Sequence, residues 1–243
     1  EKDSPVPCQP AGNGKVLVYV KDIPAKGYRS FKIRESGGSK SSGNCKHCEI
    51  ETADLTVTKQ EMENRFFKII LDQKGTILSI LDKRNNRQII SENERGNKIL
   101  AFEDRPLKYD NWNIDIYYQE KMWEVDDVEN AEVIENGPVR GCLRIRRRFL
   151  DSVITQDMII YNDIPRIDFK TRIDWNEDQI LLKADFPVDV HADKAVYEIQ
   201  FGNVERPAHQ NTSWDTARYE VCGQKWADLS EDGYGVSLLN DCK

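Results

Sequence analysis

From about residue 53 to residue 239, the chain is a succession of short segments rich in β-branched and aromatic residues. Turn signals separate these segments at close spacing, at Gly75, at 136–138 and at 162–165. Many short strands broken by frequent turns are typical of an antiparallel β-sandwich. The sequence therefore predicts an all-β fold, in the form of a large antiparallel β-sandwich. The clearest predicted strands are 15–20, 66–71, 76–81, 139–150, 153–161, 167–175, 197–201 and 235–239.

Helical patterns are weak in this sequence. Apolar residues recur at helical spacing only in residues 120–130 and 215–221, and neither segment sustains the pattern beyond about two turns. These two segments are the helix candidates, and they leave the all-β prediction unchanged.

The N-terminal part differs in composition from the rest of the chain. Two short extended patterns, at 15–20 and 28–33, precede the Gly/Ser-rich segment 35–44, which has no means of burying surface. We therefore expect a small β-segment and loop over residues 1–52 and a sandwich domain over 53–243. Because the chain stops shortly after the apolar pair Leu238 and Leu239, we expect that domain to be truncated at its C-terminus, which would leave an unpaired strand edge.

Charge and hydropathy exclude some classes of partner. The net charge is −7, and nucleic-acid binding depends on Lys and Arg placed against phosphates, so no nucleic-acid partner is expected. The basic run 144–148 lies within a predicted strand and is expected on a solvated, ion-paired face. No segment reaches the roughly 20 apolar residues of a membrane span, so no membrane insertion is expected.

The six cysteines are too sparse for a disulfide scaffold, which favours a reducing, cytoplasmic setting. Cys142 and Cys222 are predicted to be small core residues, because apolar neighbours precede or follow them. Cys45 and Cys48 form a single CxxC motif around His47, whereas a structural zinc site needs four ligands. A loop with free thiols is therefore favoured there, and metal binding by this pair is left open.

Three stretches carry residues suited to chemistry. Residues 102–118 combine four carboxylates with several aromatic rings, and sugars stack on rings while their hydroxyls bond to acids. An irregular crossover whose charges cap turns would explain this stretch equally well. Residues 201–215 combine His209 with a Trp-Asp pair, and a loop histidine is favoured there over a metal ligand. The third stretch, 225–230, is predicted to be a packed turn.

Paired carboxylates could in principle serve a retaining glycosidase, which holds two of them about 5–5.5 Å apart. Glu103, Asp104, Asp110 and Asp115 are of the right type, but a sequence gives no distances. The motifs of serine hydrolases, phosphate-binding loops and HExxH metalloproteases are all missing from the sequence. From its residues alone, the chain is a β-sandwich with a candidate sugar-binding surface.

Several of these stretches resemble, in the same order, the C-terminal half of glycoside hydrolase family 38 α-mannosidases, in the branch of bacterial, fungal-vacuolar and cytosolic enzymes. The most recognisable string is Phe102-Glu-Asp-Arg-Pro106 with Tyr109, Asp110 and Trp112. The block from Phe201 to Asp215 continues the resemblance. Its other members are 23–28, 63–67, 75–83, 165–169, 174–175, 186–187 and 233–241.

The resemblance implies a supersandwich of the galactose mutarotase type, packed against an N-terminal catalytic domain of the same polypeptide. It implies retaining hydrolysis of terminal α-D-mannosides in mannose and oligosaccharide metabolism, with an Asp nucleophile and a zinc ion in that other domain. The sequence motifs that carry this nucleophile and the zinc ligands have no counterpart in this chain. No catalytic residue, metal residue or cofactor is therefore assigned to it, and the chain alone is expected to be inactive. Candidates for the substrate groove or domain interface are Asp104, Arg105, Tyr109, Asp110, Trp112, His209, Trp214 and Asp215.

Two other interpretations are kept. The chain could be a stand-alone carbohydrate-binding or interaction module, as its aromatic and acidic loops suggest. It could instead be a mutarotase-like epimerase that uses His191 or His209 as acid or base, although no matching motif supports this. Homo-oligomer formation, sugar linkage and substrate specificity stay open at this stage.

Overall fold

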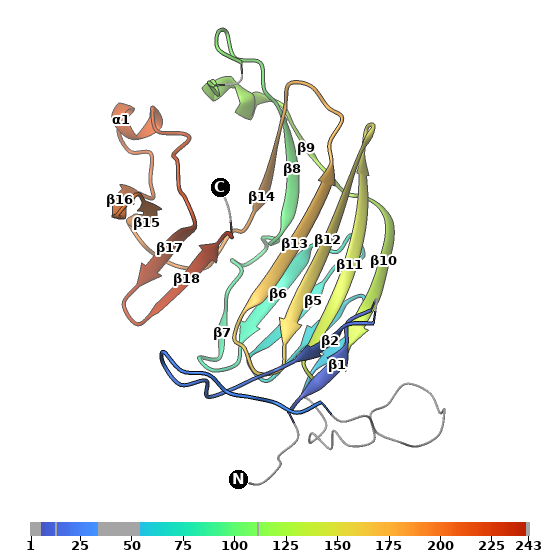
Figure 1. Ribbon diagram of the computed structural model, residues 1–243. Helices are drawn as coiled ribbons and strands as arrows, with labels where there is room; N and C mark the ends of the chain where they lie inside the picture. The colour runs from blue at the N-terminus through green and yellow to red at the C-terminus, as the bar shows by residue number, and fades with distance from the viewer. Residues whose placement is uncertain (1–5, 13, 34–53, 111, 242–243) are drawn as a thin grey trace.

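The computed structural model describes residues 6–12, 14–33, 54–110 and 112–241, and antiparallel strands dominate it (Figure 1). The all-β prediction is confirmed. The N-terminal strands β1 (Cys8–Pro10) and β2 (Val16–Val18) form a separate two-stranded sheet. A five-stranded sheet has the order β3 (Thr56–Val57), β4 (Glu61–Glu63), β5 (Phe67–Leu71), β6 (Ile77–Asp82) and β7 (Arg87–Gln88).

Three further sheets follow. The first contains, in order, β10 (Asp127–Asn136), β11 (Arg140–Phe149), β12 (Ser152–Tyr161) and β13 (Ile167–Asp174). The second contains β14 (Ile180–Asp185), β8 (Lys98–Glu103) and β9 (Met122–Glu124). The C-terminal sheet contains β16 (Gly202–Pro207), β15 (Lys194–Ile199), β17 (Trp226–Glu231) and β18 (Tyr234–Leu239). Two short helices, η1 (Ile116–Glu120) and α1 (Ser213–Thr216), lie in the loops.

The main core lies between the five-stranded sheet and the paired halves of β11 and β12 that contain Leu143 and Met158. Strand β5 alternates buried and half-buried residues, as expected for a sheet with one face on a core. The opposing strands contribute Leu143, Ile145, Met158 and Ile160, all fully buried. The remaining buried members are Leu55, Val57, Met62, Phe67, Ile69, Leu71, Ile77, Ile80 and Ile90.

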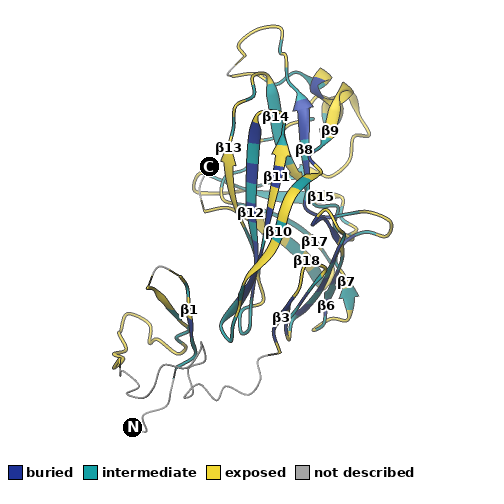
Figure 2. Ribbon diagram, turned by 90° about the vertical axis from the view of Figure 1, so that its right-hand side faces the viewer, coloured by how far each residue is buried: buried dark blue, intermediate teal, exposed yellow. Residues whose placement is uncertain are grey.

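A second core lies at the other end of the same long strands. Ile154 of β12 packs there with Ile99 and Ala101 of β8 and with Val125, and the stacked rings of Phe149 and Trp175 cover them. Strands β11 and β12 are each ten residues long and pair without interruption, so they extend about 33 Å. Figure 2 shows the buried residues running along β8 and β12. One strand pair therefore serves both cores.

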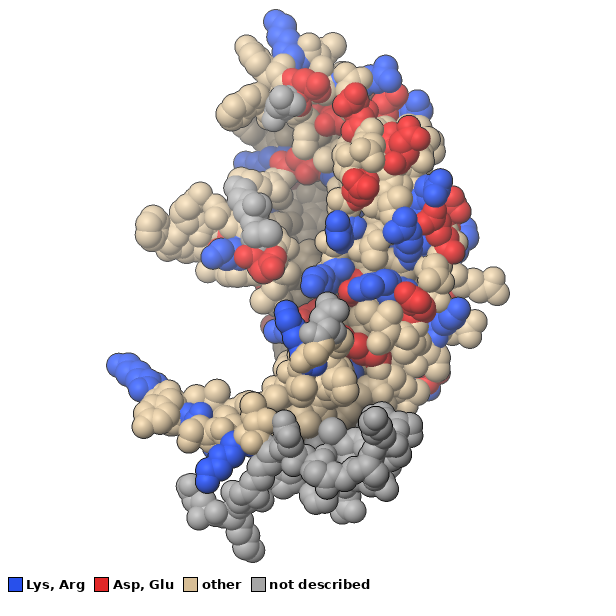
Figure 3. Space-filling view, turned by 45° about the vertical axis from the view of Figure 1, so that its right-hand side comes forward, with Lys and Arg blue, Asp and Glu red and all other residues tan. Residues whose placement is uncertain are grey.

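The basic run 144–148 divides between the two faces of β11. Arg144 pairs with Asp157, while Arg146 and Arg148 both pair with Glu129, so the ion-paired face is confirmed for these three arginines. Figure 3 shows the two signs of charge interspersed over this side of the molecule. The outer surface of the β10–β13 sheet is therefore an ordinary solvated face.

Arg147 is the exception, because it points inward and is only 2% exposed. Its Nη2 donates to the carbonyl oxygens of Lys74 (2.9 Å) and Gly75 (3.2 Å). Burial lowers the pKa of its guanidinium to about 10. The turn between β5 and β6 is thus held against β11. Gly75 closes this turn with φ +70°, and a Cβ there would lie 2.3 Å from Cδ1 of Ile145.

The C-terminal sheet stands apart from the sandwich (Figure 1). Its described residues are half-buried or exposed, and none belongs to either core. One link to the sandwich is Arg87, whose Nη1 lies 2.5 Å from Glu231 Oε1 and whose guanidinium lies over the ring of Tyr234. Strand β18 pairs with β17 and forms one edge of the sheet.

Several local predictions are wrong. Residues 120–130 form η1 and strands β9 and β10, because pairing with β8 and β11 outweighs the weak helical pattern. Helix α1 takes up only one turn, and most of 215–221 is irregular. Residues 225–230 are mainly strand β17, and 28–33 do not pair with another strand. Cys142 is buried as expected, whereas Cys222 is exposed.

Some predictions fall outside the described residues. The Gly/Ser-rich segment and Cys45, His47 and Cys48 are among these, so the boundary between residues 52 and 53 stays a prediction. Neither helix in the described part of the chain is long and apolar enough to cross a membrane.

The two hairpin glycines provide a matched test of the packing around β11. Gly75→Ala is expected to lower the free energy of unfolding by about 2–4 kcal/mol, because it combines a left-handed backbone with a clash against Ile145. Gly233 has φ +81° with no atom near the would-be Cβ, so Gly233→Ala should lower it by only about 1 kcal/mol. Urea denaturation measures both, and equal losses would contradict the proposed packing.

Candidate functional site

The loop between β8 and η1, residues 104–115, carries the first group of candidate residues. The backbone N–H of Asp104 donates to the carbonyl of Gln179 (2.8 Å), which fixes the start of the loop on the segment ahead of β14. Asp115 Oδ2 accepts from the backbone N–H of Leu107 (2.9 Å), which ties the end of the loop to its start. Its described residues, 104–110 and 112–115, are irregular in conformation, and the loop is held at both ends. We call it the 104–115 loop.

Aromatic side chains project from this loop into solvent. Trp112 is 91% exposed and Tyr109 is 75% exposed. The carbonyl of Tyr109 accepts hydrogen bonds from the N–H groups of Trp112 (2.7 Å) and Asn113 (2.9 Å), and Tyr109 itself has φ +62°. A backbone turn therefore displays these rings. A role of these rings in a contact surface stays a prediction.

An acidic hollow lies beside the loop. It has a volume of about 580 Å³ and is lined by Asp104, Asp110, Glu177, Asp178, Gln179 and Ile180. Oδ1 of Asp104 is buried without a hydrogen-bond partner among the described residues. Burial, followed by the charges of Asp110 and Asp115, raises the pKa of Asp104 above its ordinary value. Among the residues that the structure describes, no Lys or Arg forms an ion pair with these carboxylates, so the hollow is an acidic site with room for a polar ligand.

The second group of candidates lies on the loop after β16. Thr212 caps α1, where its Oγ1 accepts from the N–H of Asp215 and the Asp215 carboxylate accepts from the N–H of Thr212. The carboxylate also lies 3.6 Å from His209 Nδ1. Hydrogen bonding from Thr212 lowers the pKa of Asp215. His209 and Asp215 thus take part in a local loop structure, from which Trp214 projects with 76% exposure.

A cluster around the buried Tyr118 connects η1 and β14 to the loop after β16. The hydroxyl of Tyr118 donates to Glu220 Oε1 (2.6 Å), and Lys183 Nζ donates to the Tyr118 oxygen (2.8 Å) and to Glu220. The ring of Phe102 packs edge-on against Tyr118 with a centroid separation of 5.2 Å. Burial by itself lowers the pKa of Lys183, but the hydrogen bonds to Glu220 and Tyr118 outweigh burial and raise it.

Tyr219 extends this connection, because its hydroxyl donates to the carbonyl of Ile114 within the 104–115 loop. Sequence reasoning missed Lys183, Tyr219 and Glu220. Each is an isolated residue in its own segment, so no local pattern marks it. Together with Tyr118 they are what fixes one candidate loop relative to the other.

The structure brings only some of the predicted site residues together. Asp104 and Asp110 share the acidic hollow, whereas Arg105 is exposed and lies 3.3 Å from Glu103. His209, Trp214 and Asp215 belong to the other loop. Their roles in a substrate groove or domain interface stay predictions.

A zinc ion requires three or four converging nitrogen, oxygen or sulfur ligands. Among the described residues, no group of three or more His, Cys, Asp and Glu side chains could hold a metal ion. The carboxylates of the acidic hollow line a common space without converging on one point. The described residues therefore offer no site that fits a zinc ion, which the family resemblance assigns to another domain.

The contributions of Asp104 and Asp215 to the stability of the fold should change with pH in opposite directions. The raised pKa of Asp104 means that its ionised form destabilises the fold, so stability falls as pH rises from about 3.8 through the folded-state pKa. Asp104→Asn should therefore stabilise the chain at pH 7, with a gain that vanishes towards pH 3.8.

Asp215 serves as the control with a lowered pKa. Its stabilising contribution is present above about pH 3.8 and is lost as pH falls through the folded-state value, so Asp215→Asn should destabilise the chain at pH 7. Thermal unfolding from pH 3 to pH 7 measures both variants. Changes of the same sign in the two would be inconsistent with these environments.

The chain is similar in sequence to known α-mannosidases. "Alpha-mannosidase G" of Dictyostelium discoideum is 37% identical over 97% of this chain, which covers 22% of that protein. "Alpha-mannosidase 2C1" of Homo sapiens is 37% identical over 80% of this chain and 19% of its own length. The chain thus spans about a fifth of the length of the curated relatives it matches.

A solved structure supports the fold. The crystal structure of an α-mannosidase from Enterococcus faecalis V583 superposes with a TM-score of 0.61, over 75% of this chain and 23% of that one, at 16% sequence identity. Residues 62–243 match the family described as "Glycosyl hydrolases family 38 C-terminal domain". The chain therefore belongs to the glycosyl hydrolase family 38 C-terminal domain family.

Proposed function

We propose that this domain is the non-catalytic, C-terminal portion of a retaining α-mannosidase that hydrolyses terminal α-D-mannosides. The names of the curated relatives and the family match support this proposal. The chain spans only about a fifth of each relative, which leaves ample length in those proteins for a separate catalytic region. The zinc ion and the catalytic carboxylates are assigned to that region of the same polypeptide.

The observation that carries a more specific role is the display of Trp112. Its ring is 91% exposed on a loop that Gln179 holds at its start and Tyr219 at its end, through hydrogen bonds to the backbone of Asp104 and Ile114. A large apolar ring held in water by a fixed backbone is usually a contact residue. We assign the 104–115 loop to the junction with the catalytic region, where it supports the substrate groove.

The acidic hollow supplies the polar contacts of the same substrate groove. Asp104 and Asp110 can accept hydrogen bonds from sugar hydroxyls, while the neighbouring rings can stack on CH-rich sugar faces. The unpartnered Oδ1 of Asp104 supplies an acceptor that the domain itself does not use. A cytoplasmic location belongs to the same proposal, because Cys142 and Cys222 form no disulfide within the described part of the chain.

The isolated chain is expected to lack glycosidase activity, because no catalytic residue is assigned to it. The measurement is release of 4-nitrophenol from 4-nitrophenyl α-D-mannopyranoside by chromatographically pure chain. A rate above that of a mock preparation, co-eluting with the chain, would refute the non-catalytic assignment.

Trp112→Ala tests the role of the 104–115 loop in the full α-mannosidase polypeptide that contains this domain. Loss of the ring should lower kcat/KM for the same substrate at least about tenfold, which corresponds to about 1.4 kcal/mol. The melting temperature should not change, since Trp112 packs on little within the domain.

Leu78→Ala is the matched control, because Leu78 is also an exposed apolar residue (46%) but lies on β6 of the sandwich. Its kcat/KM should stay close to that of the unmodified protein. Equal values of kcat/KM for the two variants would contradict the assignment of the 104–115 loop to the substrate groove.

A further inference from the structure

The C-terminal sheet has two chemically different faces, which its register defines. Asp228 pairs with Ser237 on one side and with Val196 on the other, and Trp226 pairs with Leu239. Residues directly opposite each other in a sheet share a face, as do residues two apart on one strand. These five residues therefore share one face of β15, β17 and β18, which we call the tryptophan face.

The opposite face is the apolar one, and it is turned toward the sandwich. It carries Tyr197, Leu229 and Val236, all half-buried. Glu231 and Tyr234 lie on it as well, and both contact Arg87 of β7. Because the contacts with the sandwich come from this face, the tryptophan face points away from the sandwich.

Polar residues surround the tryptophan face, as expected for a solvated surface. Lys194 and Glu205 form an ion pair across β15 and β16 (2.7 Å), and Glu198 Oε2 accepts from the backbone N–H of Lys225 beside Trp226. A tryptophan on such a face is not explained by packing within the described residues. Its ring is half-buried and belongs to neither hydrophobic core.

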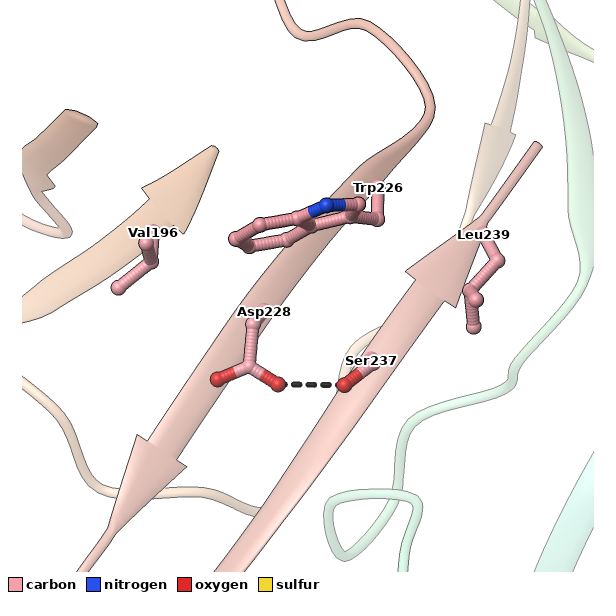
Figure 4. A pocket seen from close by; sticks show the side chains of 5 residues that line it. All are labelled: Val196, Trp226, Asp228, Ser237 and Leu239. Carbon is pink, nitrogen blue, oxygen red and sulfur yellow. Dashed lines mark hydrogen bonds between the residues drawn. The ribbon is translucent and has the colours of Figure 1, made fainter. Parts of the chain in front are cut away.

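The face is hollowed at this tryptophan. A pocket of about 360 Å³ is lined by Val196, Trp226, Asp228, Ser237 and Leu239. Figure 4 shows the Trp226 ring reaching from β17 toward Val196, with the Asp228 carboxylate on the same side of the strand and bonded to Ser237. Aliphatic side chains thus flank an aromatic ring and a carboxylate.

The carboxylate is held in a defined orientation. Its Oδ1 accepts from Ser237 Oγ and its Oδ2 accepts from Ser230 Oγ, both at 2.5 Å. A side chain on Gly235 would collide with Ser230, since a Cβ there would lie 2.3 Å from Ser230 Oγ. The glycine therefore makes room for the second hydroxyl. Each carboxylate oxygen keeps a free lone pair, and each serine oxygen can also accept a hydrogen bond.

We propose that this pocket is a binding site for a single pyranose sugar. The CH-rich face of the ring would stack on Trp226, and two of its hydroxyls would donate to the Asp228 carboxylate. Trp226 and Asp228 are two residues apart on one strand, so their side chains start about 7 Å apart, which suits one sugar ring between them. The volume of the pocket holds one such ring rather than a long chain.

The pocket favours a neutral polyol over an organic cation. Sites for quaternary ammonium groups enclose the charge in several aromatic rings. Here one ring is flanked by Val196 and Leu239, and the carboxylate is already hydrogen-bonded on both oxygens. This site is separate from the 104–115 loop and requires no catalytic partner, so it stands independently of the proposed mannosidase role.

Calorimetric titration of the whole chain with methyl α-D-mannopyranoside, and with the corresponding glucoside and galactoside, tests the proposal. At least one sugar should bind saturably in the millimolar range. Trp226→Ala should weaken its binding at least about tenfold, a loss of about 1.4 kcal/mol. Trp226→Phe should retain most of the binding, because it keeps an aromatic face. Asp228→Asn should weaken it, since one acceptor oxygen becomes a donor.

Three variants and one probe complete the experiment. Tyr28→Ala removes an exposed aromatic ring (89%) from the N-terminal segment and should leave binding unchanged, and circular dichroism should show that every variant is folded. Sugar binding that survives in Trp226→Ala but disappears in Trp112→Ala or Trp214→Ala would place the sugar on the loops and overturn the proposal. So would the absence of binding by all three sugars, or binding of choline in their place.

Discussion

The uninterrupted pairing of β11 with β12 is the constraint on which the rest of this domain depends. Ten residues of each strand align without a bulge, and the ladder is long enough to cover two separate cores. Ile145 and Met158 face the first core, while Ile154 faces the second. The same ladder holds the β5–β6 turn through Arg147 and the sheet of β8 through the buried amide pair of Asn97 and Gln156. The β11–β12 ladder therefore positions the strands that carry the candidate loops, and the sequences of the loops themselves do not determine where they lie.

The proposed site is built from groups that the fold itself does not need. Asp104 has an unpartnered oxygen and a raised pKa, while Trp112 projects its ring into water. The charge of Asp104 opposes the stability of the isolated domain, as is common at sites shaped for binding. The cluster of Tyr118, Lys183 and Glu220 stabilises the surroundings of these residues.

The sequence predicted the features that depend on local pattern. Alternation and turn residues placed β5, β6, β11, β12 and β13 close to their observed bounds, because each pairs with a neighbour in the sequence. The same reasoning failed at residues 122–124, whose pairing with β8 spans about 20 positions and competes with a weak helical pattern. Arg147 was also unforeseen, since its inward position is normally apolar and its carbonyl partners lie on a distant turn.

The candidate site was predictable by residue type but not by arrangement. The 102–118 stretch stood out through its density of acids and rings, and it does form an exposed loop beside an acidic hollow. Its connection to the second loop depends on Lys183, Tyr219 and Glu220, which lie far from it in the chain. Trp226 was missed because its isolated Trp-Ala-Asp stretch looks like a packed turn, and only pairing with β15 and β18 creates its pocket.

Hydrogen–deuterium exchange tests most directly the central claim that the 104–115 loop is a contact surface. The measurement compares the chain alone with the same chain inside the full α-mannosidase polypeptide. The amides of 104–115 should exchange more slowly in the full protein, while those of β11 and β12 should be slow in both. Unchanged exchange across 104–115, with new protection on another surface, would contradict the account.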